Sequence, residues 1–281
     1  MLRLSVPLQL RETCDARRRE GRRVGLVPTM GFLHDGHLSL VQRARALADF
    51  VVLTIFVNPA QFGPGEDLQR YPRDTDGDLD KCLRAEVDCV FVPEREAIYP
   101  AGYQTFVDVE HVSQGMCGAA RPGHFRGVAT VVAKLFNMVG PCVAVFGEKD
   151  YQQLQVLRRM ALDLDLPVEV VGSPIVREPD GLAMSSRNAY LDPSERRQAT
   201  CLHRSLEQVG ARVAMGEVTD ADQVTRMVRE LVEAEPAARV DYVEVRDAHT
   251  LEPVSRLQPG RTLVAMAVFL GQTRLIDNRV V

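Results

Sequence analysis

The feature that most constrains this chain is a short apolar run near the N-terminus that leads through a glycine-bearing turn into an amphipathic helix. The run is Val24 to Val27, and apolar residues recur at helical spacing after His37. This pattern predicts a buried strand that continues directly into a helix. The turn between them reads Pro28-Thr29-Met30-Gly31-Phe32-Leu33-His34-Asp35-Gly36-His37.

This junction is suited to bind a phosphate. Unpaired backbone N–H groups and the positive end of the helix dipole both point outward at a helix N-terminus. Gly31 and Gly36 have no Cβ, so a flat or charged ligand can approach the backbone closely. His34 and His37 are three residues apart and can share one helical face. Their N–H donors suit a reaction in which charge builds on phosphoryl oxygens.

Histidines at this spacing also occur incidentally, and some bind zinc. A zinc site needs a third and a fourth ligand at sensible spacing. The other histidines supply no obvious one; they are His111, His124, His203 and His249. The phosphate interpretation therefore depends on the rest of the chain.

Length, charge and cysteine usage limit the possible classes of function. At 281 residues the chain exceeds the usual size of a single core, which favours two domains. A net charge of -4 and a pI near 5.9 lack the basic footprint of a nucleic-acid binder. The 6 cysteines are scattered, as expected for buried thiols in a reducing compartment. Without an apolar segment of signal-peptide or membrane-spanning length, we expect a cytoplasmic protein that does not associate with membranes.

The apolar runs of the N-terminal part predict an α/β fold. Short runs rich in β-branched residues alternate with helical patterns, as in a parallel sheet covered by helices on both faces. We expect a Rossmann-like domain over residues 1–174, with a hinge at Gly172-Ser173-Pro174. Its strands are expected at residues 24–27, 50–57, 89–92, 142–146 and 168–171.

A smaller α+β domain is predicted over residues 175–281. Asp192-Pro193-Ser194-Glu195 has the cap, proline and acid of a helix start, and this helix is expected to run toward Ala214. A second helix is expected to open at Thr219. Three strands are expected, over residues 240–245, 263–270 and 275–277.

Polar residues follow several of the predicted strands. Gln61 lies in the loop after 50–57, while Lys149 and Gln153 follow 142–146. Ligands of open parallel sheets bind beyond the carboxyl ends of the strands, so these side chains should lie beside the histidine turn. The acidic stretch 67–80 offers oxygen donors that can hold Mg²⁺ on a nucleotide. Plain turns and solvated helix starts use the same residue types.

Five blocks of sequence, in a fixed order, resemble one family. The His-x-Gly-His turn is similar to a signature of nucleotidylyltransferases and class I aminoacyl-tRNA synthetases, and the other blocks narrow the resemblance to the pantothenate synthetases. The blocks are Pro28-Thr29-Met30-Gly31, Phe56-Val57-Asn58-Pro59-x-Gln61-Phe62, Arg121-Pro122-x-His124-Phe125-x-Gly127-Val128, Phe146-Gly147-Glu148-Lys149-Asp150-Tyr151-Gln152-Gln153 and Met184-Ser185-Ser186-Arg187-Asn188.

The resemblance implies a reaction. Members of this family condense (R)-pantoate with β-alanine, using ATP with Mg²⁺, and release AMP and pyrophosphate through a pantoyl adenylate. It also implies a homodimer, and a C-terminal domain that acts as a lid over the reactive intermediate. Two alternatives stay open: another small-molecule nucleotidylyltransferase of the same superfamily, and a non-catalytic nucleotide-binding module.

The resemblance further implies roles for individual residues. His34 and His37 would contact the ATP phosphates, while Lys149 and Arg187 would stabilise the departing pyrophosphate, so these are the catalytic candidates. The full set of ATP-binding candidates is Met30, Gly31, Phe32, Leu33, His34, Asp35, Gly36, His37, Gly147, Glu148, Lys149, Asp150, Val176, Met184, Ser185, Ser186 and Arg187.

The substrate and metal ligands are implied in the same way. Gln61 and Gln153 would hold pantoate, and Arg121 would lie near the dimer contact and the pantoate pocket. Asp78 would hold the metal, although Gly77 stands where many relatives carry another acid.

Overall fold

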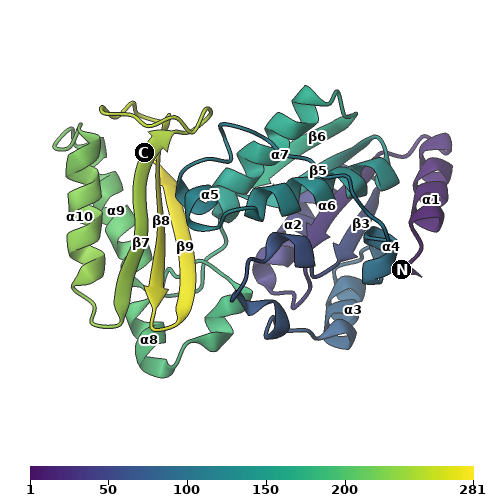
Figure 1. Ribbon diagram of the computed structural model, residues 1–281, viewed down its shortest axis with the longest axis horizontal. Helices are drawn as coiled ribbons and strands as arrows, with labels where there is room; N and C mark the ends of the chain where they lie inside the picture. Colours follow the sequence, from purple (N-terminus) through teal and green to yellow (C-terminus); the bar gives the residue numbers. More distant parts are fainter.

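Six parallel strands form the sheet of the N-terminal part of the protein, in a computed structural model that describes all residues from Met1 to Val281 (Figure 1). Every pair of neighbouring strands runs parallel. In their order across the sheet the strands are β1 (Leu2–Leu4), β4 (Cys89–Phe91), β3 (Phe50–Ile55), β2 (Val24–Thr29), β5 (Cys142–Gly147) and β6 (Val168–Ser173).

Helices cover both faces of this sheet. Alternate residues of a strand point to opposite faces, so Val52 packs in one apolar core and Leu53 in the other. On one face lie α1 (Pro7–Arg19), α6 (His124–Val139) and α7 (Tyr151–Asp163). On the other lie α2 (Asp35–Arg45) and α3 (Thr75–Arg84). Short helices in the connections are α4 (Arg95–Ile98), α5 (Met116–Ala120), η1 (Pro59–Gln61), η2 (Asp67–Gln69), η3 (Glu148–Asp150) and η4 (Ser186–Tyr190).

The strand order reverses direction between β2 and β5. From β2 the chain proceeds outward through β3 to β4, and from β5 it proceeds the opposite way to β6. Connections that leave in opposite directions open a crevice at the carboxyl ends of the two central strands. The histidine turn follows β2 and the Lys149 turn follows β5, so the topology brings both to this crevice.

A second, antiparallel sheet forms the C-terminal part. Helices α9 (Cys201–Ala214) and α10 (Ala221–Glu233) lie on the side of this sheet that faces away from the six-stranded sheet (Figure 1). Its other face meets the N-terminal part through a small apolar cluster that includes Met116 and Leu263. The elements are α8 (Pro193–Gln198), α9 (Cys201–Ala214), α10 (Ala221–Glu233), β7 (Ala238–Asp247), β8 (Thr262–Leu270) and β9 (Thr273–Val280).

The predicted α/β class is confirmed, with two local corrections. The helix predicted to run from Pro193 toward Ala214 is broken at Ala199-Thr200, where the Thr200 hydroxyl donates to the carbonyl of Arg197 and competes with the helical bonds. The helix expected to open at Thr219 begins at Ala221. Its cap is Asp220, whose Oδ1 accepts the N–H groups of residues 222 and 223.

None of the helices combines the length and the apolar character that a bilayer crossing requires. The proposed domain boundary at residue 174 falls directly after β6, which ends at Ser173.

Gly127 sets the packing of α6 against η1, which carries Gln61. A Cβ at position 127 would stand 2.1 Å from the carbonyl oxygen of Ala60, which is backbone and cannot turn away. Gly127→Ala should therefore displace η1 and lower the free energy of unfolding by about 1–3 kcal/mol, measured by urea unfolding. The control is Gly63→Ala, whose added Cβ has its nearest neighbour at 3.6 Å. Equal stabilities for the two variants would contradict this packing.

Candidate active site

The turn between β2 and α2 is held by Asp78 of α3. Asp78 is buried, and its two carboxylate oxygens accept the N–H groups of Phe32 and Leu33 at 2.7 Å each. Gly31 and Phe32 both have positive φ, which a non-glycine residue adopts only when neighbouring contacts impose it. The carboxylate thus fixes the backbone that precedes α2. The role of Asp78 as a metal ligand stays a prediction.

The hydrogen bond between the two histidines determines a tautomer. His37 Nδ1 accepts the backbone N–H of His34 at 3.3 Å, so the proton of a neutral His37 ring is on Nε2, where it can be donated. The ring centroids of His34 and His37 are 4.0 Å apart. Gly36 makes room for this arrangement, because a Cβ there would come within 2.9 Å of the His34 ring.

Burial keeps both histidines neutral near pH 7. Desolvation, followed by the charge of Lys149, lowers the pKa of His34 from 6.5 to about 4. Desolvation and the neighbouring His34 lower the pKa of His37 well below 6.5. Neutral imidazoles can approach each other without repulsion and still offer N–H donors to an anion.

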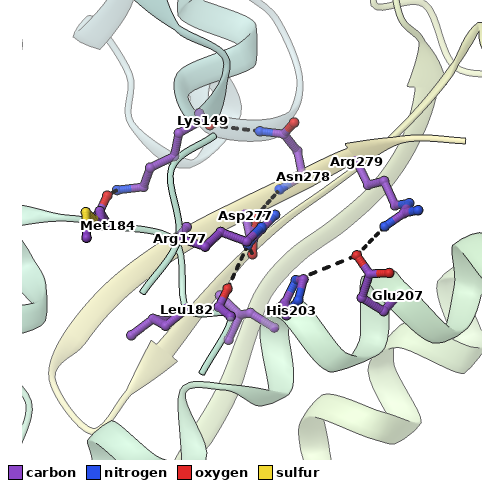
Figure 2. A network of polar contacts seen from close by, with 12 residues as sticks. Lys149, Arg177, Leu182, Met184, His203, Glu207, Asp277, Asn278 and Arg279 are labelled. Atoms are coloured by element: carbon purple, nitrogen blue, oxygen red, sulfur yellow. Dashed lines mark hydrogen bonds and ion pairs between the residues drawn. The ribbon is translucent and has the colours of Figure 1, made fainter. Parts of the chain in front are cut away.

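Lys149 lines the same cavity as the histidines, in η3 at the carboxyl end of β5. Its Nζ donates to the carbonyl oxygen of Met184 at 3.0 Å, and Figure 2 shows the side chain extended toward that residue. Burial lowers the pKa of Lys149 from its usual 10.5. The ammonium group therefore gains from any anion that enters the cavity.

Two arginines are held in the same region by carboxylates of the loop after β3. Arg187 makes paired bonds to Asp67 at 2.9 and 2.8 Å, and Arg121 makes paired bonds to Glu66 at 2.8 and 2.6 Å. Burial alone would raise the pKa of each carboxyl, but the arginine bonds lower it below its usual value. Arg121 also donates to the backbone carbonyl of Gln61 at 3.2 Å, so it supports the loop that carries this glutamine.

The two glutamines proposed to hold pantoate face one cavity. Gln61 accepts a bond from Asn58 at 3.0 Å and directs its Nε2 toward the sulfur of Met30 at 3.2 Å. The Gln153 side chain lines the same cavity. The neighbouring Gln152 is different, because its amide is buried in bonds to the segment 112–117.

The cavity has a volume of about 240 Å³ and is lined by most of the predicted site residues. Those that line it are Met30, His34, Gly36, His37, Gln61, Arg121, Gly147, Lys149, Asp150, Gln153, Val176, Met184, Ser185, Ser186 and Arg187. The structure places six others outside the lining: Gly31, Phe32, Leu33, Asp35, Asp78 and Glu148.

Several lining or supporting residues were not predicted. Asn58 is buried, donates to Gln61 and to the carbonyl of Gly127, and accepts the hydroxyl of Tyr99. Tyr71 lines the cavity beside Arg187. The Asn-Pro pair at 58–59 signals only a turn, and the partners of Asn58 are distant in sequence, so a single sequence carries no sign of this network.

A doubly wound parallel sheet with paired histidines, a lysine and two arginines around its crevice defines an α/β protein with a crevice suited to anionic ligands. A family model described as Pantoate-beta-alanine ligase matches residues 4–280. The chain belongs to the pantoate–β-alanine ligase family.

Individual relatives agree with the family model. The chain is 55% identical over 261 residues to the pantothenate synthetase of Geobacter sulfurreducens, covering 93% of this chain and 92% of the relative. The crystal structure of pantothenate synthetase from Thermus thermophilus matches with a TM-score of 0.93 and 48% identity, over 100% of this chain and 99% of that one. The ligase from Francisella tularensis, complexed with "Beta-gamma ATP" and β-alanine, matches with a TM-score of 0.81 and 29% identity, over 100% and 97%.

Acid should destabilise the fold through His34. Because the pKa falls from 6.5 to about 4 on folding, the unfolded chain binds more protons between these values. The contribution of His34 to the free energy of unfolding is therefore complete above pH 6.5 and is lost as the pH falls toward 4. The slope of the free energy of unfolding against pH reports the difference in bound protons between the unfolded and folded chain. His34→Gln should reduce this difference by up to about one proton between pH 4 and 6.5, measured by urea unfolding across the range. The exposed His111, changed to Asn, is the control; equal slopes for wild type and His34→Gln would refute the assignment.

Proposed function

We propose that this enzyme carries out its family's reaction in two steps within the one cavity. The reaction joins (R)-pantoate to β-alanine with consumption of ATP, giving pantothenate, AMP and pyrophosphate. The observation that carries the proposal is the meeting of two kinds of group in one cavity, phosphate-binding cations and donors together with two neutral amides.

In the first step the pantoate carboxylate attacks the α-phosphorus of ATP. An oxygen–phosphorus bond forms to give pantoyl adenylate, and the bond from the α-phosphorus to the bridging oxygen breaks as pyrophosphate leaves. His34 and His37 donate N–H groups to the phosphoryl oxygens. Lys149, Arg187 and the hydroxyls of Ser185 and Ser186 stabilise the departing pyrophosphate.

In the second step the neutral amine of β-alanine attacks the activated carbonyl carbon. A carbon–nitrogen bond forms, the carbon–oxygen bond to the phosphate breaks, and AMP leaves with the electron pair while the amine loses a proton. No side chain becomes covalently linked to substrate, so the chain contributes positioning and charge stabilisation.

Gln61 and Gln153 are the proposed pantoate ligands. An amide offers both a donor and an acceptor without a charge, which suits the hydroxyl and the carboxylate of a hydroxy acid. Gln61 reaches the cavity from the loop after β3, and Gln153 from the first turn of α7. A nucleotide-only site has no need of this pair, which weighs against the alternative of another small-molecule nucleotidylyltransferase.

We propose that Mg²⁺ enters as part of the nucleotide substrate. No group of three or more His, Cys, Asp or Glu side chains in the chain is placed to hold a metal ion. Mg²⁺ usually takes only one or two protein carboxylates and completes its shell with phosphates and water, and it supplies neutralising charge on phosphate oxygens. Asp78 is the proposed carboxylate, although both its oxygens already accept backbone N–H groups.

Three further proposals extend the function beyond the single cavity. We propose that residues 175–281 form a separate lid domain, that the enzyme is a homodimer, and that it works in the cytoplasm. The lid is supported by Val176, Met184 and Arg187, which lie beyond residue 174 and line the same cavity as the histidines. The dimer and the location rest on the resemblance.

ATP–pyrophosphate exchange tests the proposed adenylation. The enzyme should catalyse exchange with pantoate in the absence of β-alanine, and a deoxy analogue should be rejected by as much as about 10⁴-fold. Gln61→Ala and Gln153→Ala should weaken the use of pantoate while ATP binding by calorimetry is unchanged. Gln42→Ala, on the exposed side of α2, is the control. Strict dependence of exchange on β-alanine would exclude a free-standing adenylation step.

Single substitutions test the phosphate-binding groups. His34→Ala and His37→Ala should each lower turnover by about 10² to 10³, the usual loss when one oxyanion donor is removed. Lys149→Ala should depress adenylate formation but largely spare the attack of β-alanine on supplied pantoyl adenylate. Lys134→Ala is the control, since its ammonium lies over the Tyr103 ring and outside the cavity lining. Equal losses of Lys149→Ala in both half-reactions would indicate a general defect instead.

A further inference from the structure

The turn that carries Lys149 is bound by a residue of the C-terminal sheet. Asn278, in β9, directs its side-chain amide to two successive carbonyl oxygens of this turn, those of Glu148 at 2.9 Å and Lys149 at 2.8 Å (Figure 2). Asn278 is 6% exposed, so the amide is shielded from water. One buried NH₂ group therefore joins the two parts of the protein at the residue proposed to stabilise pyrophosphate.

The preceding residue of β9, Asp277, is linked indirectly to the ammonium end of the Lys149 side chain. Asp277 is buried and accepts paired bonds from Arg177 at 2.7 and 2.9 Å. Arg177 pairs with Ala183 in an antiparallel bridge, and the N–H of Met184 donates to Val176 at 3.0 Å. The carbonyl of Met184 in turn accepts Lys149 Nζ, so the bonds close a loop.

We propose that Asn278 is a positioning residue for Lys149 in the adenylation step. This inference rests on the proposed function of Lys149. Asn278 fixes the backbone from which the lysine extends, while Asp277, through Arg177, fixes the segment that receives its ammonium group. Adjacent residues of one strand thus determine where the positive charge stands relative to the histidines, and neither Asn278 nor Asp277 needs to touch the substrate.

An alternative is that Asn278 only stabilises the contact between the two sheets. The two roles differ in their dependence on Lys149. A positioning residue loses its effect on the rate when the group that it positions is removed, whereas a general stabiliser keeps its own effect in any background. A double-mutant cycle between positions 149 and 278 therefore separates them.

The experiment measures ATP–pyrophosphate exchange with pantoate for Asn278→Asp, Asn278→Ala, Lys149→Ala and the double variant Lys149→Ala/Asn278→Ala. Asn278→Asp keeps the shape but replaces the donor with an oxygen that faces two carbonyl oxygens, and Asn278→Ala removes the amide without that repulsion. Each should lower exchange by about 10²-fold, the cost of a displacement of about 1 Å in a reacting group. The double variant should be no slower than Lys149→Ala.

Val268→Ala is the matched control for stability. Val268 is fully buried in the core of the same sheet and lines no part of the cavity, so its truncation lowers the melting temperature without touching the turn. Exchange by this control should stay at the wild-type rate, at a temperature where all variants are folded.

Each remaining outcome overturns a stated claim. Near-normal exchange by Asn278→Ala, or losses that multiply in the double variant, would refute positioning while leaving the role of Lys149 intact. An equal loss of exchange in Val268→Ala would reduce Asn278 to a stabiliser of the sheet. Normal exchange by Lys149→Ala would instead refute the proposed role of the lysine, and the inference would fall with it.

Discussion

The site depends first on the Asp78 carboxylate. By accepting two successive backbone N–H groups it holds a turn that contains positive φ values at Gly31 and Phe32, and so sets where α2 begins. The positions of His34 and His37 in the cavity depend on where this helix begins. The N–H of His34 meets His37 Nδ1 only because the chain enters the helix at this angle. A buried carboxylate is costly unless its oxygens are bonded, and here the turn supplies both bonds.

Carboxylates also hold two of the three cations of the cavity in place. Two arginines and a lysine near one another would repel, and each would lose hydration. Glu66 and Asp67, adjacent in one loop, each accept paired bonds from an arginine, which orients the guanidinium groups and offsets part of their charge. Lys149 has only a neutral carbonyl as its partner. Of these three cations it is the one without a bonded carboxylate, and it therefore has the most to gain from phosphate.

The sequence predicts five of the six parallel strands because each is expressed locally, and it predicts about half of the residues that line the cavity. A buried strand such as β3 is a continuous apolar run, and ligands bind beyond the carboxyl ends of such strands. The break at Thr200 was not foreseen, since a hydroxyl that bonds its own helix backbone leaves the apolar period unchanged. Long-range polar contacts were missed because no local pattern joins their partners: Arg177 and Asp277 are 100 residues apart, and Asn278 is 129 residues from Lys149. These contacts form only when the two sheets pack together. The periodicity of the sequence indicates which face of each sheet is apolar, but not which polar residues then meet.

The bond between Lys149 and Met184 bears on how the cavity accepts ATP. A carbonyl oxygen satisfies the ammonium group while the phosphates are absent, but an ionised phosphate adds the attraction of an opposite charge, which is strong away from bulk water. Under the proposed function the lysine exchanges its partner when ATP binds, and the Met184 carbonyl loses its bond to the ammonium group. Because Asn278 holds the backbone of Lys149 and not its ammonium group, this exchange can occur without any change in the contact between the sheets. The ammonium group can turn toward the substrate while the backbone of Lys149 stays fixed.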